Sequence, residues 1–148
     1  GSKLGRPSFS TYVNKDLLAK SNKKGEKLTF IRASDEVIRE HKIDTKTDGT
    51  DQYLEEYLSG RHTVRSIPLS AAAVRAKLGA SLLPCYVFSN DKTVVRPADA
   101  NIMLWGHIWL MHHKDLRQSA RIRALFSHLR KLEENWPKGW DNTLQSDA

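Results

Sequence analysis

The chain has 148 residues, of which 39% are hydrophobic, and this is enough for one domain with a buried core. No run of about 18 apolar residues occurs, so the sequence predicts no membrane-spanning segment. The single cysteine excludes an internal disulfide and predicts a cytoplasmic protein, while the net charge of +7 favours an anionic partner.

The first part of the chain predicts two strands around a short helix. Residues 8–13 alternate and are β-prone, and residues 27–32 (KLTFIR) form a second strand candidate. Between them, Asn14 is placed to cap a short helix. Residues 34–43 fit either a helix that opens at Ser34 or a loop.

The middle of the chain predicts two helices and a strand. Residues 51–60 (DQYLEEYLSG) predict a helix that ends at its final glycine, and residues 62–66 a short strand. Ser66 can cap the next helix, with Pro68 in the first turn and Gly79 at the end. The residues expected on the buried side of that helix are Ala71, Val74 and Leu78.

The second half predicts three more strands and a terminal helix. Residues 80–88 (ASLLPCYVF) are apolar on both faces, which is typical of a covered central strand, although Pro84 must break its ladder. Residues 92–97 predict a short strand and residues 104–113 a long one, and residues 119–136 an amphipathic helix. The alternation of strands and helices predicts an α/β fold with a mostly parallel or mixed sheet.

The sequence offers no support for catalysis or metal binding. On a strand, His107 and His113 point away from His112, so the three cannot converge on one metal ion. Cys85 lies in an apolar run, which favours a buried thiol, and an enzyme that uses it with a histidine is a competing hypothesis. We predict no enzyme activity, no catalytic residue, no metal and no cofactor.

The helix start at Ser66 is the remaining candidate site. Helix N-termini offer free N–H groups and a partial positive charge, which suit a small carboxylate or another anion. In the competing interpretation, the Ser66 hydroxyl only caps its own helix. The basic residues in 20–27 and 117–123 fit a solvated loop and a solvated helix face, with a small basic nucleic-acid-binding module as the alternative function.

Two segments resemble the effector-binding domain of LysR-type transcriptional regulators. They are SIPLSAAAVRAKLGASLLPCYVF (residues 66–88) and HIWLMHHKDLRQSARIRALFSHL (residues 107–129). That family typically has a serine that opens a helix, a Leu-Leu-Pro strand, and then a strand ending in His before Asp-Leu-Arg. Lys77 replaces the usual glycine, which predicts a less tightly turned helix end, and Lys114 replaces a usual proline.

The resemblance implies a periplasmic-binding-protein-like (type 2) lobe with a mixed sheet flanked by helices. Residues 3–111 would form the second lobe, residues 112–136 a terminal helix that returns toward the first lobe, and residues 137–148 a polar tail. The family also has a DNA-binding head and a first lobe before this region. We therefore expect either a fragment or a truncated gene product that lacks the head and most of the first lobe.

The resemblance also implies a function. A bacterial, cytoplasmic sensor of this kind binds a small-molecule effector between its lobes and controls transcription, and it contacts DNA only through the absent head. Carried over by position, Ser66 is the best-supported ligand contact, with Ile67 beside it and with Asn14, Ser34 and Asp35 near the same mouth. In the competing interpretation, Asn14 and Ser34 only cap helices and Asp35 is solvated.

Self-association is a further expectation. Without a first lobe, the apolar face of the terminal helix is left partly uncovered, and a homodimer would bury it. The residues expected on that face are Ile122, Leu125 and Phe126.

Overall fold

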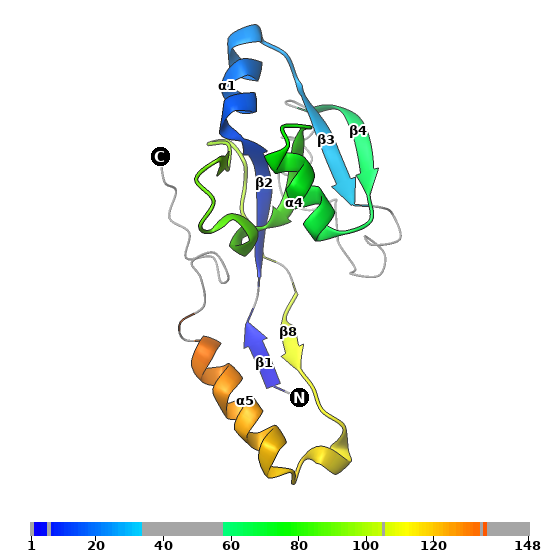
Figure 1. The fold of residues 1–148 in the computed structure, drawn as a ribbon, viewed down its shortest axis with the longest axis vertical. Helices are drawn as coiled ribbons and strands as arrows, with labels where there is room; N and C mark the ends of the chain where they lie inside the picture. Colours follow the sequence, from blue (N-terminus) through cyan, green and yellow to red (C-terminus); the bar gives the residue numbers. More distant parts are fainter. Residues whose placement is uncertain (1, 6, 34–57, 105, 134, 136–148) are drawn as a thin grey trace.

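The computed structural model describes residues 2–5, 7–33, 58–104, 106–133 and 135. Their strands form two sheets that lie in different parts of the molecule (Figure 1). One helix packs across the larger sheet, and the smaller sheet lies beside the last helix. The two parts are described below as the large unit and the small unit.

The large unit is built on a six-stranded mixed sheet. Its strands are β2 (Ser8–Asn14), β3 (Leu28–Ala33), β4 (Leu58–Val64), β5 (Ala80–Pro84), β6 (Val94–Val95) and β7 (Met103–Leu104). The order is β4-β3-β5-β2-β6, with β7 also paired to β2. Strand β3 runs parallel to β4 and β5, whereas β2 runs antiparallel to β5, β6 and β7. Together with helices α1 (Lys15–Lys24) and α4 (Ile67–Arg75), this mixed sheet confirms the predicted fold class.

The small unit contains β1 (Ser2–Gly5), β8 (Ile108–Leu110) and α5 (Ala120–Glu133). Strands β1 and β8 pair antiparallel, and α5 packs against β1. The predicted long strand over 104–113 is wrong, because the chain leaves the large sheet after β7 and joins β1 only at Ile108. The predicted amphipathic helix is confirmed by α5.

The core of the large unit lies where α4 packs on the sheet. Ala71 and Val74 of α4 are buried with Tyr12 of β2, Ile31 of β3 and Leu83 of β5. The central position of β5, between β3 and β2, agrees with its apolar sequence.

Two expectations about this region are wrong. The strand predicted over 80–88 stops at Pro84, which has no N–H to extend the ladder, and Cys85–Phe88 form a 3-10 turn, η1. Leu78, expected on the buried side of the helix, is 60% exposed because α4 has already ended at Arg75.

Both ends of α4 are fixed by specific hydrogen bonds. At the start, Ser66 Oγ accepts a hydrogen bond from the Leu69 N–H at 3.3 Å, as its sequence position predicts. At the end, the Lys77 N–H donates to the Val74 carbonyl and the Leu78 N–H to the Ala73 carbonyl, which together form a Schellman motif. Lys77 adopts the left-handed φ of 63° that this motif requires, so the predicted looser helix end is wrong.

Of the remaining predictions, some concern residues that the structure describes and others concern residues that it does not describe. Asn14 caps α1 as predicted, since its Oδ1 accepts from the Asp16 N–H at 3.0 Å. Leu58 to Gly60 belong to β4, so Gly60 does not end a helix. The interpretations of 34–43 and 51–57 fall outside the described residues. Within the described ranges, no helix is long and apolar enough to cross a membrane.

Gly79, between α4 and β5, provides a test of this packing. A Cβ atom there would overlap the Thr29 carbonyl oxygen of β3 and would lie 3.3 Å from Ile31 Cγ1. We expect Gly79→Ala to lower the free energy of unfolding by more than about 2 kcal/mol, because the backbone of β3 must move to make room for the added methyl group. Urea unfolding measures this, with Gly106→Ala as the matched control, since a Cβ at Gly106 meets nothing within 4 Å. Equal free energies of unfolding for Gly79→Ala and Gly106→Ala would contradict the close approach of Gly79 to the Thr29 carbonyl.

Candidate functional site

The start of α4 lies at the edge of the large sheet where β3 and β4 end. Ala33, the last residue of β3, pairs with Val64, the last residue of β4, and Ser66 follows two residues later. Ser66 is exposed, and so is its neighbour Ile67, at 36%. The parallel direction of β3 and β4 brings both carboxyl ends to this edge.

Few backbone donors remain free in the first turn of α4. Pro68 has no N–H, the Leu69 N–H is bonded to Ser66 Oγ, and the Ser70 N–H is bonded to the Ser66 carbonyl. With respect to the residues that the structure describes, the Ile67 N–H is therefore the donor left over in this turn. The Ser66 hydroxyl, which accepts the capping bond, keeps its own hydrogen to donate.

These two donors lie next to apolar side chains. Ile67 is partly exposed and Leu69 is 53% exposed on the same turn. The start of α4 can thus hold two oxygens of a small anion through Ser66 Oγ and Ile67 N, and an apolar portion beside Leu69.

Asn14 lies at the other end of α4 and is not brought together with Ser66. It is buried, and its Nδ2 donates to the Arg75 carbonyl at 3.5 Å. At 1.5 Å of rise per residue, the nine residues of α4 separate the two positions by about 13 Å. The reason is strand direction: β2 is antiparallel to β5, so β2 ends at the edge opposite to the ends of β3 and β4.

Ser34 and Asp35 fall outside the described residues. They follow Ala33, which pairs with Val64 at the edge of the sheet that leads to Ser66.

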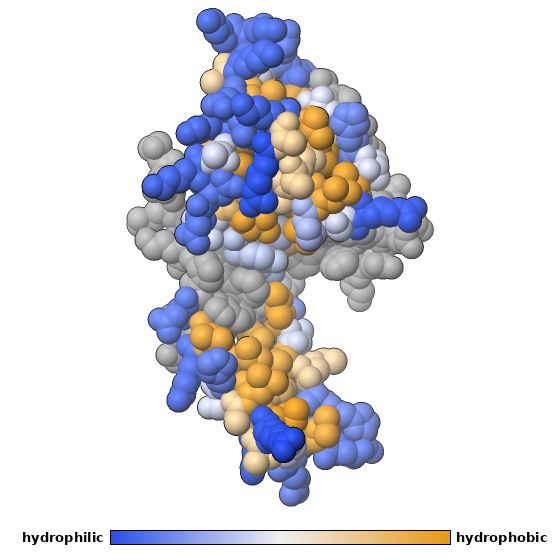
Figure 2. Space-filling model, in the orientation of Figure 1, coloured by the Kyte–Doolittle hydropathy of each residue, from blue (hydrophilic) through white to orange (hydrophobic). Residues whose placement is uncertain are grey.

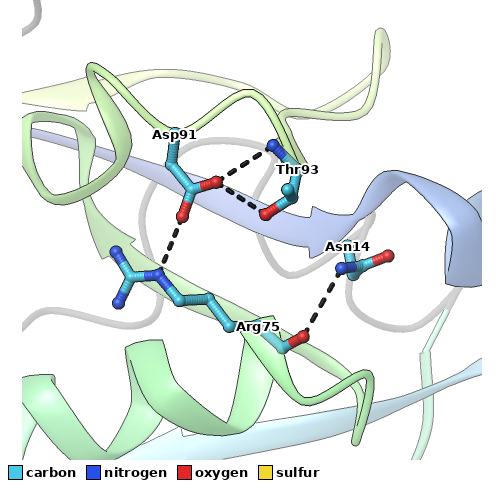
Figure 3. Close-up of polar contacts among 4 residues, drawn as sticks. All are labelled: Asn14, Arg75, Asp91 and Thr93. Carbon is cyan, nitrogen blue, oxygen red and sulfur yellow. Dashed lines mark hydrogen bonds and ion pairs between the residues drawn. The ribbon is translucent and has the colours of Figure 1, made fainter.

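Around the C-terminal end of α4 the structure brings together polar residues that sequence reasoning missed (Figure 3). Arg75 Nε donates to Asp91 Oδ2 at 2.8 Å, and Asp91 Oδ1 accepts from the Thr93 N–H at 3.0 Å and from Thr93 Oγ1 at 2.6 Å. The Thr93 hydrogen bond, followed by that of Arg75, lowers the pKa of Asp91 to about 2. The Asp-x-Thr spacing indicates the local turn, but no sequence pattern predicts the contact with Arg75.

Cys85 lies in the core, next to Tyr12. The residue is 1% exposed, and its thiol is a hydrogen-bonding partner of the Tyr12 hydroxyl. Burial, followed by this hydrogen bond, raises the pKa of Tyr12 above its usual range. Among the described residues, no group of three or more His, Cys, Asp or Glu side chains is arranged to hold a metal ion.

Comparison with protein families decides the class of this domain. The model for the LysR substrate binding domain matches residues 37–133. The chain belongs to the LysR substrate-binding domain family. Proteins of this family are transcriptional regulators rather than enzymes.

Solved structures share the fold of this LysR-type domain. The effector domain of the regulator AmpR of Pseudomonas aeruginosa matches with a TM-score of 0.63 and 14% identity, over 93% of this chain and 66% of that chain. The AmpR effector-binding domain from Citrobacter freundii gives 0.61 and 12%, over 90% and 67%. The full-length LTTR LysG from Corynebacterium glutamicum, with bound effector Arg, gives 0.50 and 16%, over 90% and 46%.

The chain matches only part of the length of these proteins. This LysR-type domain spans slightly less than two thirds of the P. aeruginosa AmpR effector domain and less than half of full-length LysG. No curated protein sequence matches the chain.

The Arg75–Asp91 contact predicts a pH-dependent contribution to stability. The pKa of Asp91 is lower in the folded chain, at about 2, than its ordinary 3.8, so folding favours the charged carboxylate. Its stabilisation is complete above pH 3.8 and is lost as the pH falls toward 2. We expect Asp91→Asn to lower the free energy of unfolding by about 1 kcal/mol at pH 7, and the deficit to shrink in acid.

Urea unfolding between pH 7 and about pH 2 measures this difference. Asp99→Asn, at an exposed position nearby, is the matched control and should follow the parent chain. If the free energy of unfolding of Asp91→Asn stays lower than that of the parent by the same amount at every pH, the lowered pKa of Asp91 is contradicted.

Proposed function

We propose that this chain is the effector-sensing part of a LysR-type transcriptional regulator that works in the bacterial cytoplasm. The family match over residues 37–133 carries this proposal. Residues 3–111 would form the second lobe, residues 112–136 the helix that returns toward the first lobe, and residues 137–148 a polar tail. The pairing of β1 with β8 beside α5 favours grouping these two strands with that helix.

The proposed effector is a small molecule with a carboxylate. Ser66 Oγ and the Ile67 N–H would donate to its two oxygens, and the partial positive charge at the start of α4 would favour its negative charge. Exposed Leu69 would contact an apolar part. The effector Arg named for LysG also carries a carboxylate, which supports this class. In the full-length regulator, occupancy would alter the arrangement of the lobes and control transcription through the DNA-binding head.

Thermal melting against a panel of small monocarboxylates, arginine included, tests the proposal. We expect one class to raise the melting temperature and the rise to disappear in Ser66→Ala. That variant should also melt a few degrees lower without ligand, since loss of an N-cap costs about 1 kcal/mol. The two effects are separable, because the second needs no ligand.

The control for this experiment is Ser127→Ala, an exposed serine on α5, away from α4. It should keep the full ligand-induced rise. A rise that is retained in Ser66→Ala would show that Ser66 acts only as a cap, and would contradict its assignment as a ligand contact.

We also propose that the chain self-associates through the small unit. Apolar side chains gather over this unit (Figure 2). Trp109 of β8 is 52% exposed and Leu125 of α5 is 49% exposed, while Ile122 and Phe126 are half-buried. Burial of such a surface against a second copy is favourable at roughly 25 cal/mol per Å².

Leu125→Asp tests this contact. We expect it to shift the chain from dimer to monomer in analytical ultracentrifugation, or to make it insoluble, because a carboxylate cannot be buried there without a partner. Leu78→Asp is the matched control, since Leu78 is exposed on the large unit and should leave the assembly unchanged. An unaltered, well-folded oligomer of Leu125→Asp would exclude α5 as the contact.

A further inference from the structure

A polar depression lies at the C-terminal end of α4, at the end away from Ser66. Its volume is about 530 Å³, and its lining includes Arg75, Tyr86, Asn90, Asp91 and Lys92. These residues come from α4, from η1 and from the turn that leads to β6. The depression is therefore separate from the start of α4, where the proposed effector would bind.

The Arg75 side chain is held in one orientation within this depression. Its Nε is bonded to Asp91, and its guanidinium carbon lies 5.0 Å from the centre of the Phe88 ring. Figure 3 shows the two terminal nitrogens pointing away from Asp91. Within the described part of the chain, neither terminal nitrogen has a hydrogen-bonding partner, and the side chain is 47% exposed. The outer edge of the guanidinium is thus pre-oriented and open.

Asp91 acts as a fixed support for Arg75. Its Oδ2 accepts one hydrogen bond from Arg75, and its Oδ1 accepts two from Thr93. The Asp91 side chain is only 18% exposed. A carboxylate with both oxygens occupied competes weakly for further donors. With Lys92 exposed beside it, the lining carries two positive charges and one negative charge.

We propose that this depression is a second anion-binding site, which takes a small di- or tricarboxylate on the terminal nitrogens of Arg75 with Lys92 as a second cation. A guanidinium edge presents two parallel N–H donors, which match the two oxygens of a carboxylate. Lys92 supplies a mobile point charge for the second carboxylate of the same ligand. Phosphate shares the oxygen-pair chemistry, so the experiment compares the two anions.

The test is an NMR titration of the 15N-labelled chain with citrate, and in parallel with inorganic phosphate, at constant ionic strength set by sodium chloride. We expect saturable shifts of the Arg75 Nε–H and of the backbone amides of 89–92, with Ser66 and Ile67 unmoved. Citrate should bind more tightly than phosphate. Lys92→Gln should weaken citrate binding at least threefold, roughly the loss of one partly screened charge contact.

The variants separate the site from the fold. Arg75→Lys keeps the charge but removes the paired donors, and should weaken citrate binding more than Lys92→Gln does. Since Arg75→Lys also disturbs the bond to Asp91, Lys92→Gln, outside that contact, keeps the test sound if the first variant unfolds. Arg121→Gln, on exposed α5, is the matched control and should bind as the parent chain does.

Three results would overturn the proposal: shifts that never saturate, equal citrate binding in Lys92→Gln and the parent, or tighter binding of phosphate than of citrate. Saturable shifts centred on Ser66 and Ile67 would also overturn it, while supporting the proposed effector site. The titration therefore distinguishes the failure of the proposed site at Arg75 and Lys92 from the failure of the proposed effector site at Ser66.

Discussion

The packing of α4 on the large sheet is the contact on which both candidate sites depend. Ala71 and Val74 bury one side of this short helix against the sheet, and Gly79 lets the chain turn back under it toward β5. At nine residues the helix is too short to be stable alone in water, so its position comes from burial. Any shift of α4 on the sheet would move the donors at its start and the charged groups at its end together.

The two ends of α4 differ in what they can bind, and local chemistry explains the difference. At the start, the capping bond and Pro68 consume the donors that a helix N-terminus usually offers, which leaves Ser66 Oγ and Ile67 N. At the end, the Schellman turn satisfies the last carbonyls, and Asn14 satisfies that of Arg75. The Arg75 side chain is then fixed by Asp91. One end presents neutral donors and the other presents cations.

The small unit follows different physics from the large one. Two strands and one helix bury little apolar surface on their own, and Trp109, Leu125 and Leu132 are each about half exposed. The large unit, by contrast, buries residues from four strands and α4 in a common core. The relatives of this chain extend beyond the region that it matches. An apolar surface of this kind is characteristic of a contact with further protein.

The sequence by itself determined the local elements and the family: β2, α1 with its Asn14 cap, α4 with its Ser66 cap, and α5. Helix caps and hydrophobic periodicity depend on residues that are only a few positions apart, so a single sequence is enough to recognise them. Only the tertiary structure decided that Asn14 lies away from Ser66, that residues 104–113 divide between two sheets, and that Arg75 meets Asp91. These outcomes follow from strand order and direction, which depend on pairings between distant segments that no local pattern encodes.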